Sequence, residues 1–416
     1  MKKKVRALTF LGKIHYGWII CVSCMLLMIC TMGFCNNVFP VYLPYLEKTY
    51  LTGAQGSSLI SIRCLFGILG MLLVNWFYRS LSLRGGMVVA CVITAMAFFI
   101  YSMADTYWIF TLAAAVSGLG YGFGSMIPVG ILMRNWFAER RGTAIGICAA
   151  GSGISMILFP PIVTKIIEIA GLTASFRMQT FLALVIGGII FIIVRDSPGD
   201  KGILPYGEQT KRNTETMAVH AETPPKGKTP GKGIVIAVCF LIGSVAASAP
   251  GHFAAFFSTQ GYPMGHVSLG ISVFGLTLTL GKFFCGTQFD RMGGRNAGIL
   301  FFAVAFMGCI LCCFTDGITL APMFGGLACM GIGLAPATVG IPVWASDFSW
   351  NGNYQTLLKW LQIMYTAGGM VMSVLPGVIY DHTNSYLSAY LLFALLLVLV
   401  SAGLWGAYSL KLHERL

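Results

Sequence analysis

Long apolar runs constrain this chain more than any other feature of its sequence. Stretches of about 20 apolar residues recur along its whole length of 416 residues, and about 20 residues are what a helix needs to cross a bilayer. The chain is 56% hydrophobic and only 10% charged, whereas soluble domains average about 25% charged residues. A soluble protein of this composition would expose far too much apolar surface. The sequence therefore predicts an all-α membrane protein.

The apolar runs divide into two groups of six. The first group covers roughly residues 15–38, 54–78, 86–104, 107–133, 143–168 and 177–194. The second group covers roughly residues 233–259, 265–289, 296–315, 318–346, 355–379 and 385–410. The stretch between them, rich in Pro, Gly, Thr and basic residues, cannot build a core. We expect an N-terminal six-helix bundle over 1–198, a cytoplasmic linker over 199–232 and a C-terminal six-helix bundle over 233–416.

The placement of basic residues predicts the orientation in the membrane. Of the 27 Lys and Arg residues, 22 fall in the two termini, the linker and the loops on the same side. Cytoplasmic loops are enriched in Lys and Arg, so we expect both termini in the cytoplasm and a multi-pass protein of the cell inner (plasma) membrane. The same pattern explains the net charge of +13 without nucleic acid as a partner. No small-residue cleavage site follows a short apolar region, so we expect the first helix to be uncleaved.

Two cations, Arg63 and Lys282, lie deep inside apolar segments, and no acidic residue in the sequence lies equally deep. A lone charge at membrane depth costs about 2.5–3.5 kcal/mol on insertion scales, so it is a candidate functional residue. Two cations without a carboxylate to neutralise them suggest that the missing partner is a transported anion. The alternative is that each snorkels, or bonds to backbone carbonyls, for packing alone.

A signature follows the eighth apolar segment: Gly286-Thr-Gln-Phe-Asp290-Arg291-Met-Gly293-Gly-Arg295. It resembles the G-x-x-x-D-R-x-G-x-R signature of the major facilitator superfamily. The resemblance implies twelve transmembrane helices in two six-helix bundles, the major facilitator fold. It also implies a conformational latch made of the signature residues, to which we add Arg140 and Arg141 of the loop after the fourth segment. In the first half the signature is degraded, with Asn75 where Asp is expected.

Three further stretches resemble the oxalate/formate antiporter and monocarboxylate transporter branches of that superfamily. They are "NWFAERRGTAIGICAAGSG" from Asn135, "RDSPGDKGILPYGE" after the sixth segment, and "YTAGG" in the eleventh. In this subfamily a basic residue upstream of the signature is implicated in carboxylate binding, and Lys282 occupies that position. Oxalate transporters add a second Lys in the eleventh segment, where this chain has Ala367-Gly368-Gly369. This departure puts a dicarboxylate such as oxalate in doubt and leaves a monocarboxylate or a larger anion open.

Five other residues are candidates for the same site. His252 could carry a proton, because its reference pKa is near neutrality, although a hydrogen-bonded structural role is the alternative. Asn36 and Asn37 could bond to the substrate or join helices. Tyr121 and Tyr365 are candidate cavity liners. No metal-binding or catalytic grouping is present in the sequence, so we expect no cofactor and no enzymatic activity.

These features together predict a secondary active transporter of small organic anions, with mono- or dicarboxylates as the expected substrates. It would work by alternating access, as an anion exchanger or a proton symporter, and as a monomer in the lipid bilayer. The alternative is a proton-coupled exporter of drugs or amphipathic metabolites, although such exporters usually need a membrane-buried carboxylate. A third class, a receptor or membrane enzyme, lacks support because the sequence shows no catalytic groups.

Overall fold

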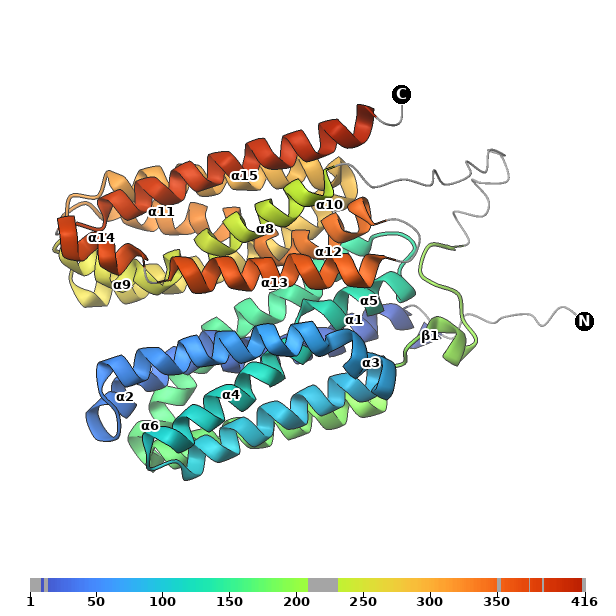
Figure 1. Cartoon of the computed structure of the whole chain (residues 1–416), viewed down its shortest axis with the longest axis horizontal. Coiled ribbons are helices and arrows are strands. Elements are labelled where there is room, and N and C mark those ends of the chain that lie inside the picture. The colour runs from blue at the N-terminus through green and yellow to red at the C-terminus, as the bar shows by residue number, and fades with distance from the viewer. Residues whose placement is uncertain are drawn as a thin grey trace, which may run out of the picture. The chain divides into compact units, whose positions relative to one another are not determined.

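A computed structural model describes residues 9–10, 14–208, 231–349, 353–373, 375–383 and 385–413. Most of the predicted linker, residues 209–230, lies outside the described residues. The chain divides into two compact units, Met1–Gly227 (unit 1) and Lys228–Leu416 (unit 2). Within each unit, almost all described residues are helical, as the apolar runs predict (Figure 1).

Unit 1 begins with a short antiparallel strand pair and continues as a helical bundle. Its first membrane segment changes helix type twice, from α to π and then to a 3-10 turn. Its elements are β1 (Thr9–Phe10), β2 (Ile14–His15), α1 (Tyr16–Met28), the π-helix η1 (Ile29–Val38), the 3-10 helix η2 (Phe39–Tyr42), α2 (Leu43–Thr49), α3 (Gly53–Met103), α4 (Tyr107–Phe123), α5 (Met126–Trp136), α6 (Arg141–Ile193) and η3 (Pro198–Lys201).

Unit 2 consists of helices joined by short loops in its described part. Its elements are α8 (Lys232–Ala246), α9 (Ala249–Thr259), α10 (Met264–Cys313), α11 (Leu320–Gly333), α12 (Pro336–Phe348), α13 (Tyr354–Met372), α14 (Leu375–Thr383) and α15 (Leu387–His413).

Three of these helices are pairs of membrane segments joined at a backbone break. The breaks lie at Ser82 in α3 (φ 64°), Gly171 in α6 (φ 84°) and Gly293 in α10 (φ 77°). In α3 the two halves meet beside the break, where Phe77 and Ala90 share one buried cluster with Phe123. In the described residues, nine helical stretches are long and apolar enough to cross a membrane, and the three broken ones each supply two segments. The structure therefore gives twelve segments.

Glycines set the same close helix contacts in both units. In unit 1, a methyl group on Gly118 of α4 would collide with the Arg63 carbonyl oxygen of α3. In unit 2, a methyl group on Gly331 of α11 would lie 2.7 Å from the Phe274 carbonyl oxygen of α10. Small residues at such crossings let two backbones approach closely, which supplies packing energy in a membrane. The two units thus repeat one packing scheme.

The repeat has a fixed register over the second segment of each unit. Phe274 stands 211 positions after Arg63, and the break at Gly293 stands 211 positions after the break at Ser82. Both breaks have a positive φ, which Gly adopts without steric cost and Ser adopts only under strain. The packing contact and the chain reversal therefore agree on the same alignment of the two halves.

This register corrects the alignment of the degraded signature. Arg79 stands 211 positions before Asp290, and Asn75 stands 211 positions before Gly286. The prediction that Asn75 replaces the signature Asp is therefore wrong. Arg79 stands at the acidic position, so the charge there is reversed in unit 1. The sequence alone did not predict this alignment, because the position of the chain reversal at Ser82 cannot be read from the pattern of polar residues.

A steric prediction follows from the contact between α8 and α13. A methyl group on Gly243 would lie 2.6 Å from the Tyr365 carbonyl carbon, whereas one on Gly233 of the same helix would meet nothing within 4 Å. We expect Gly243→Ala to destabilise the protein by about 2 kcal/mol through overpacking, lowering the unfolding temperature by several degrees. Gly233→Ala is the matched control and should leave it unchanged or slightly higher. Thermal unfolding in detergent measures both, and equal melting temperatures for the two variants would contradict the packing scheme.

Candidate functional site

Arg63 is buried in the first half of α3 and is bonded to the first membrane segment. Its side chain is 5% exposed. One terminal nitrogen, Nη1, donates to the Cys35 carbonyl oxygen, and the other, Nη2, donates to Asn36 Oδ1 at 2.9 Å. Both acceptors are neutral oxygens, so neither cancels the positive charge of the guanidinium.

The Cys35 carbonyl is open to Arg63 because of the local backbone. An α-helical bond to this carbonyl would come from the Phe39 N–H, but that N–H bonds to the Phe34 carbonyl in the π-helical pattern. The π-helical bond to Cys35 would come from Pro40, which has no N–H. Arg63 supplies the missing donor. Its role as a partner of backbone carbonyls, one of the two alternatives left by the sequence, is therefore present in the structure.

The two asparagines extend this bond network to a third segment. Asn36 Nδ2 lies 3.5 Å from Asn37 Oδ1, and Asn37 Nδ2 donates to the Ser152 carbonyl oxygen of α6 at 2.7 Å. Both asparagines are half-buried. Asn37 thus joins two helices, while substrate contact by either residue stays a prediction.

Lys282 lies in the first half of α10 on the side that faces away from lipid. Its side chain is 3% exposed. Leu276, Leu280 and Phe284, spaced four residues apart, are 46–62% exposed and mark the lipid-facing stripe of this helix. Lys282 lies two residues beyond Leu280, about 200° around the helix, so it faces the protein interior.

The two cations lie at different depths in their own units. Lys282 precedes the break at Gly293 by eleven residues, about 16 Å of helix, whereas Arg63 precedes the break at Ser82 by nineteen residues, about 28 Å. Lys282 is at mid-membrane depth by this measure, and Arg63 is closer to the opposite end of its segment.

His252 lies in α9 and bonds within its own helix. Its Nδ1 is 2.9 Å from the Ser248 carbonyl oxygen. A carbonyl only accepts hydrogen bonds, so Nδ1 is the donor in this contact. The Tyr386 ring lies 6.2 Å away, centroid to centroid. A structural hydrogen bond is therefore present, and proton transfer by His252 stays a prediction.

The two predicted tyrosines are buried in their own units. Tyr121 of α4 is 7% exposed and packs against Gly67 of α3. Tyr365 of α13 is also 7% exposed, and its backbone passes Gly243 of α8. Both lie at close helix crossings, and a role in lining a substrate cavity stays a prediction for each.

The signature residues cluster at the end of the first half of α10. Gly286 is buried, Asp290 and Arg291 are exposed, and Gly293 forms the chain break. Arg295 donates through Nε to Asn296 Oδ1 at 3.1 Å. In unit 1, Arg140 adopts a left-handed conformation at the start of α6 (φ 54°), and Arg141 donates to the Phe137 carbonyl oxygen at 3.3 Å. Their role as a latch stays a prediction.

The sequence missed an acidic residue at the break of unit 2. The Asp347 carboxylate, at the end of α12, accepts from the Tyr408 hydroxyl of α15. A methyl group on Gly294 would lie 2.7 Å from the same carboxylate, and Trp344 Nε1 donates to the Gly294 carbonyl oxygen at 3.1 Å. The end of α12 therefore joins three segments beside the signature, with Asp347 bonded to α15 and Trp344 bonded to the second half of α10. The position of Asp347 at the end of an apolar run was the only signal in the sequence.

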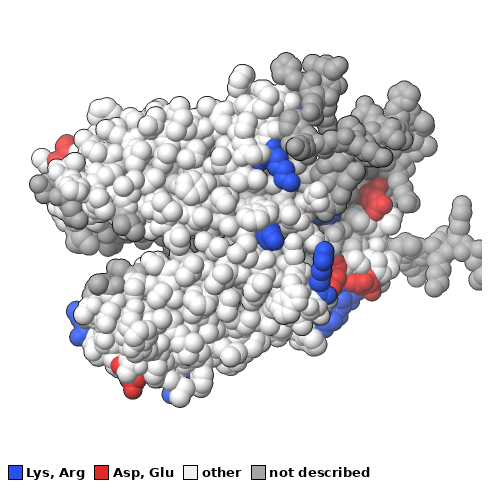
Figure 2. Space-filling view, in the orientation of Figure 1, with Lys and Arg blue, Asp and Glu red and all other residues white. Residues whose placement is uncertain are grey.

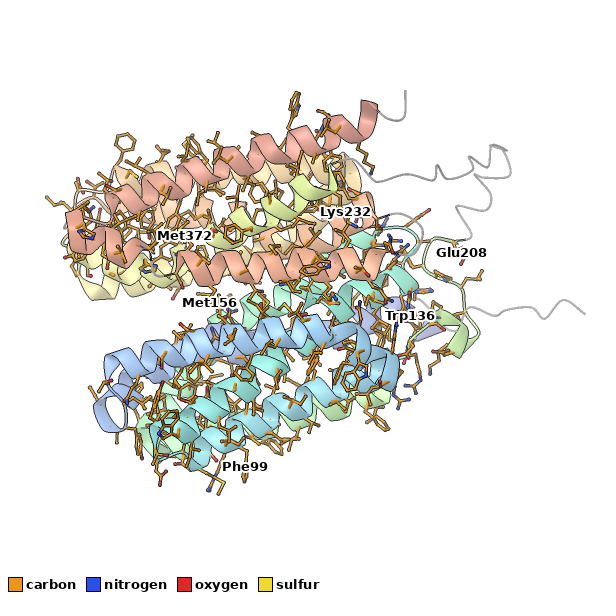
Figure 3. All side chains as sticks on the ribbon, viewed as in Figure 1. Phe99, Trp136, Met156, Glu208, Lys232 and Met372 are labelled. Carbon is orange, nitrogen blue, oxygen red and sulfur yellow. The ribbon has the colours of Figure 1, made fainter. Side chains whose placement is uncertain are left out.

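In unit 1, residues directly after α6 form comparable hydrogen bonds beside the break. The Asp196 carboxylate accepts from the backbone N–H groups of Leu83 (3.3 Å) and Arg84 (2.7 Å), directly after the break at Ser82. Trp136 Nε1, at the end of α5, donates to the Arg195 carbonyl oxygen at 3.0 Å (Figure 3). One of the stretches that carries the subfamily resemblance thus caps a helix start.

The fold defines a class of protein before any comparison is made. Two units of six membrane segments that repeat the same helix packings, with buried cations inside apolar helices, form a multi-pass membrane carrier. The chain belongs to the Major Facilitator Superfamily, whose family model matches residues 24–358.

The relatives of this chain include both an efflux protein and carboxylate transporters. Agnestins efflux protein AgnL12 of Paecilomyces divaricatus is 25% identical over 74% of this chain and 70% of its own length. Monocarboxylate transporter 12 of Mus musculus is 24% identical over 91% of this chain and 82% of its own length. The oxalate:formate antiporter of Oxalobacter formigenes is 33% identical, but over only 24% of this chain and 23% of its own length.

Solved structures agree on the fold. The fucose:proton symporter of E. coli superposes with a TM-score of 0.66 at 13% identity, covering 94% of this chain and 99% of that one. The predicted family and all-α membrane fold are confirmed. The protein is a membrane transporter and not an enzyme.

Proposed function

We propose that this protein is a secondary active transporter of small organic anions, with monocarboxylates as the first class to test. One observation carries the proposal. Among the residues whose side chains the structure describes, the buried charged side chains are Arg63 and Lys282, and both are cations. A buried charge is costly in a membrane, and a carboxylate substrate would bring an opposite charge to these two cations.

Lys282 is the proposed primary contact for the carboxylate. It is buried, lies at mid-membrane depth in its unit and faces away from the lipid stripe of α10. It also stands where the subfamily resemblance places a carboxylate-binding cation. Arg63, Asn36, Asn37, His252, Tyr121 and Tyr365 are proposed as secondary contacts or supports, with His252 available for proton coupling. Transport would follow alternating access, either as anion exchange or as proton–anion symport.

The packing of α13 supports a monocarboxylate over oxalate. A methyl group on Gly368 would collide with the Phe240 carbonyl oxygen of α8, and one on Gly369 would lie 2.6 Å from the Ala247 side chain. A lysine at either position would therefore separate the two helices. This chain uses the place of the second oxalate cation for close packing.

The alternative is a proton-coupled exporter of drugs or amphipathic metabolites, which the fungal efflux relative favours. An exporter that trades protons for cations usually needs a buried carboxylate. In the described part of the chain, no Asp or Glu is among the buried side chains. We therefore place the anion transporter first. We further propose a plasma-membrane location, cytoplasmic termini and a monomeric state.

Uptake into proteoliposomes tests the proposal. Purified protein would be reconstituted and offered labelled carboxylates of increasing size, with and without a pH gradient. We expect saturable uptake of at least one monocarboxylate, with protein-free liposomes as the control. Stimulation by an inward proton gradient would indicate symport, and stimulation by internal unlabelled anion would indicate exchange. Uptake or efflux of cationic amphiphiles, with no carboxylate moved, would overturn the proposal in favour of the exporter.

A further inference from the structure

Arg84 has a guanidinium for which the described residues of unit 1 provide no hydrogen-bond acceptor. It follows the break at Ser82, and its backbone N–H bonds to the Asp196 carboxylate. Its Nε is buried and lacks a hydrogen-bond partner, and the side chain has no bond or ion pair to any described residue. The guanidinium carbon lies 4.2 Å from the centroid of the Phe191 ring. An Arg on an aromatic face gains a cation–π contact, but its N–H donors stay available.

The surroundings of Arg84 combine a lipid-facing surface with basic residues. Phe191 and Ile192, at the end of α6, are 56% and 69% exposed, and Phe181 earlier in the helix is 65% exposed. This helix therefore presents an apolar face along its length. Charged side chains, Lys and Arg together with Asp and Glu, lie toward the two ends of the unit 1 face drawn in Figure 2, while the middle of that face is almost free of charge. Arg84 contacts the apolar face of α6 through Phe191.

A second arginine, Arg195, precedes Asp196 in the chain, and its guanidinium is bonded to backbone carbonyl oxygens. Arg195 Nη1 donates to the carbonyl oxygens of Ile192 (3.0 Å) and Val194 (2.7 Å). Cations at a helix C-terminus satisfy its last carbonyls, and this role accounts for Arg195. It does not account for Arg84, which bonds to none of these carbonyls. Asp196 forms no ion pair with the Arg84 guanidinium; its two carboxylate oxygens accept from the backbone N–H groups of Leu83 and Arg84.

The equivalent arginine in unit 2 can be compared with Arg84. Arg295 stands 211 positions after Arg84, at the same place after the break in unit 2. Its Nε donates to Asn296 Oδ1 at 3.1 Å. The same donor is therefore satisfied in unit 2 and orphaned in unit 1. Since a buried donor without an acceptor costs about 1–3 kcal/mol, an external acceptor is expected in unit 1.

We propose that Arg84, Arg195, Phe191 and Ile192 form a binding site for the headgroup of an anionic phospholipid. The guanidinium of Arg84 donates to phosphate oxygens in the fork geometry that suits them, and Arg195 adds a second positive charge. The acyl chains lie along the exposed face of α6. A soluble phosphate would gain the charge contacts but not this apolar surface. Basic pockets between membrane helices on the cytoplasmic side are suited to such headgroups.

Lipid-dependent thermal unfolding of the full chain tests the site. Purified protein in detergent would be titrated with phosphatidylglycerol, with phosphatidylcholine and with soluble glycerol phosphate. We expect phosphatidylglycerol alone to raise the unfolding temperature, and Arg84→Gln to weaken its apparent affinity about tenfold, which is the loss of one charge-assisted contact. Arg295→Gln is the matched control and should keep the wild-type affinity. Arg84→Lys should retain part of the effect, because it keeps charge but not the fork.

Three outcomes would overturn the proposal. Equal stabilisation by phosphatidylcholine would show that headgroup charge is not recognised. Equal stabilisation by glycerol phosphate would assign the site to a soluble anion. An unchanged phosphatidylglycerol affinity in Arg84→Gln would place the lipid elsewhere, even if the lipid-free protein became less stable. Native mass spectrometry of bound lipid in the same variants distinguishes lost binding from lost folding.

Discussion

Lys282→Gln is expected to lower the rate of carboxylate uptake by at least about 100-fold without lowering the amount of protein in the membrane. Gln has a similar length and still forms hydrogen bonds, but it removes the charge. A desolvated charge pair that loses one partner costs about 2–5 kcal/mol, and 100-fold corresponds to about 3 kcal/mol. The variant should fold, because removing a buried, costly charge does not leave a cavity at this position.

Uptake in proteoliposomes and membrane abundance together measure this prediction. Lys282→Arg should retain much of the activity, because it keeps the positive charge. Lys165→Gln is the control for charge alone, since Lys165 is an exposed residue of α6. Normal uptake by Lys282→Gln at normal abundance would remove Lys282 from the site. It would not by itself exclude anion transport, which the wild-type substrate panel tests.

Arg63→Gln is expected to impair both stability and transport, because Arg63 holds the π-helical segment and supplies positive charge. The variant leaves the Cys35 carbonyl without a donor, and an unsatisfied buried acceptor costs about 1–3 kcal/mol. We expect an unfolding temperature lower by several degrees and uptake reduced by at least about tenfold. Thermal unfolding and proteoliposome uptake measure the two effects separately.

A second substitution distinguishes the structural role of Arg63 from a role in transport. Pro40→Ala restores an N–H at the position from which a π-helical bond to Cys35 would come. In the Arg63→Gln background it should recover part of the lost stability but none of the lost uptake. Recovery of uptake together with stability would mean that Arg63 only fastens the first segment. Pro40→Ala alone is the matched control and should transport normally.

The membrane segments were predictable from the sequence because their signal is local. An apolar run long enough to cross a bilayer must be helical to satisfy its own backbone, whatever it packs against. The helix ends and breaks were less accessible. All three pairs were separated correctly in sequence. The exact position of the turn at Ser82 was not predictable, because it depends on a strained residue and on Asp196, which caps the next two N–H groups from over 100 positions away.

The site could be predicted in part. Charge inside an apolar run marks Arg63 and Lys282 without any structure, since the cost of burial depends on the residue and its depth. The acceptors of Arg63 could not be found this way. They depend on a π-helical segment whose bonding pattern is set by Pro40 and by the approach of α3. Asp347 was missed because its partners, Tyr408 and Gly294, come from distant parts of the chain.

By itself, the sequence determined that this chain is a helical membrane transporter with buried cations and few charges elsewhere in its apolar segments. Segment length, composition and a local signature are properties of neighbouring residues, so they can be recognised without knowing the fold. The tertiary structure decided three things: the register between the two repeats, the depths of Lys282 and Arg63 in their helices, and the hydrogen bonding of the arginine after each break. That arginine has an acceptor for its Nε in unit 2 and none in unit 1. These features depend on which helices pack against each other, and the packing is determined by close contacts at glycines between residues far apart in the chain.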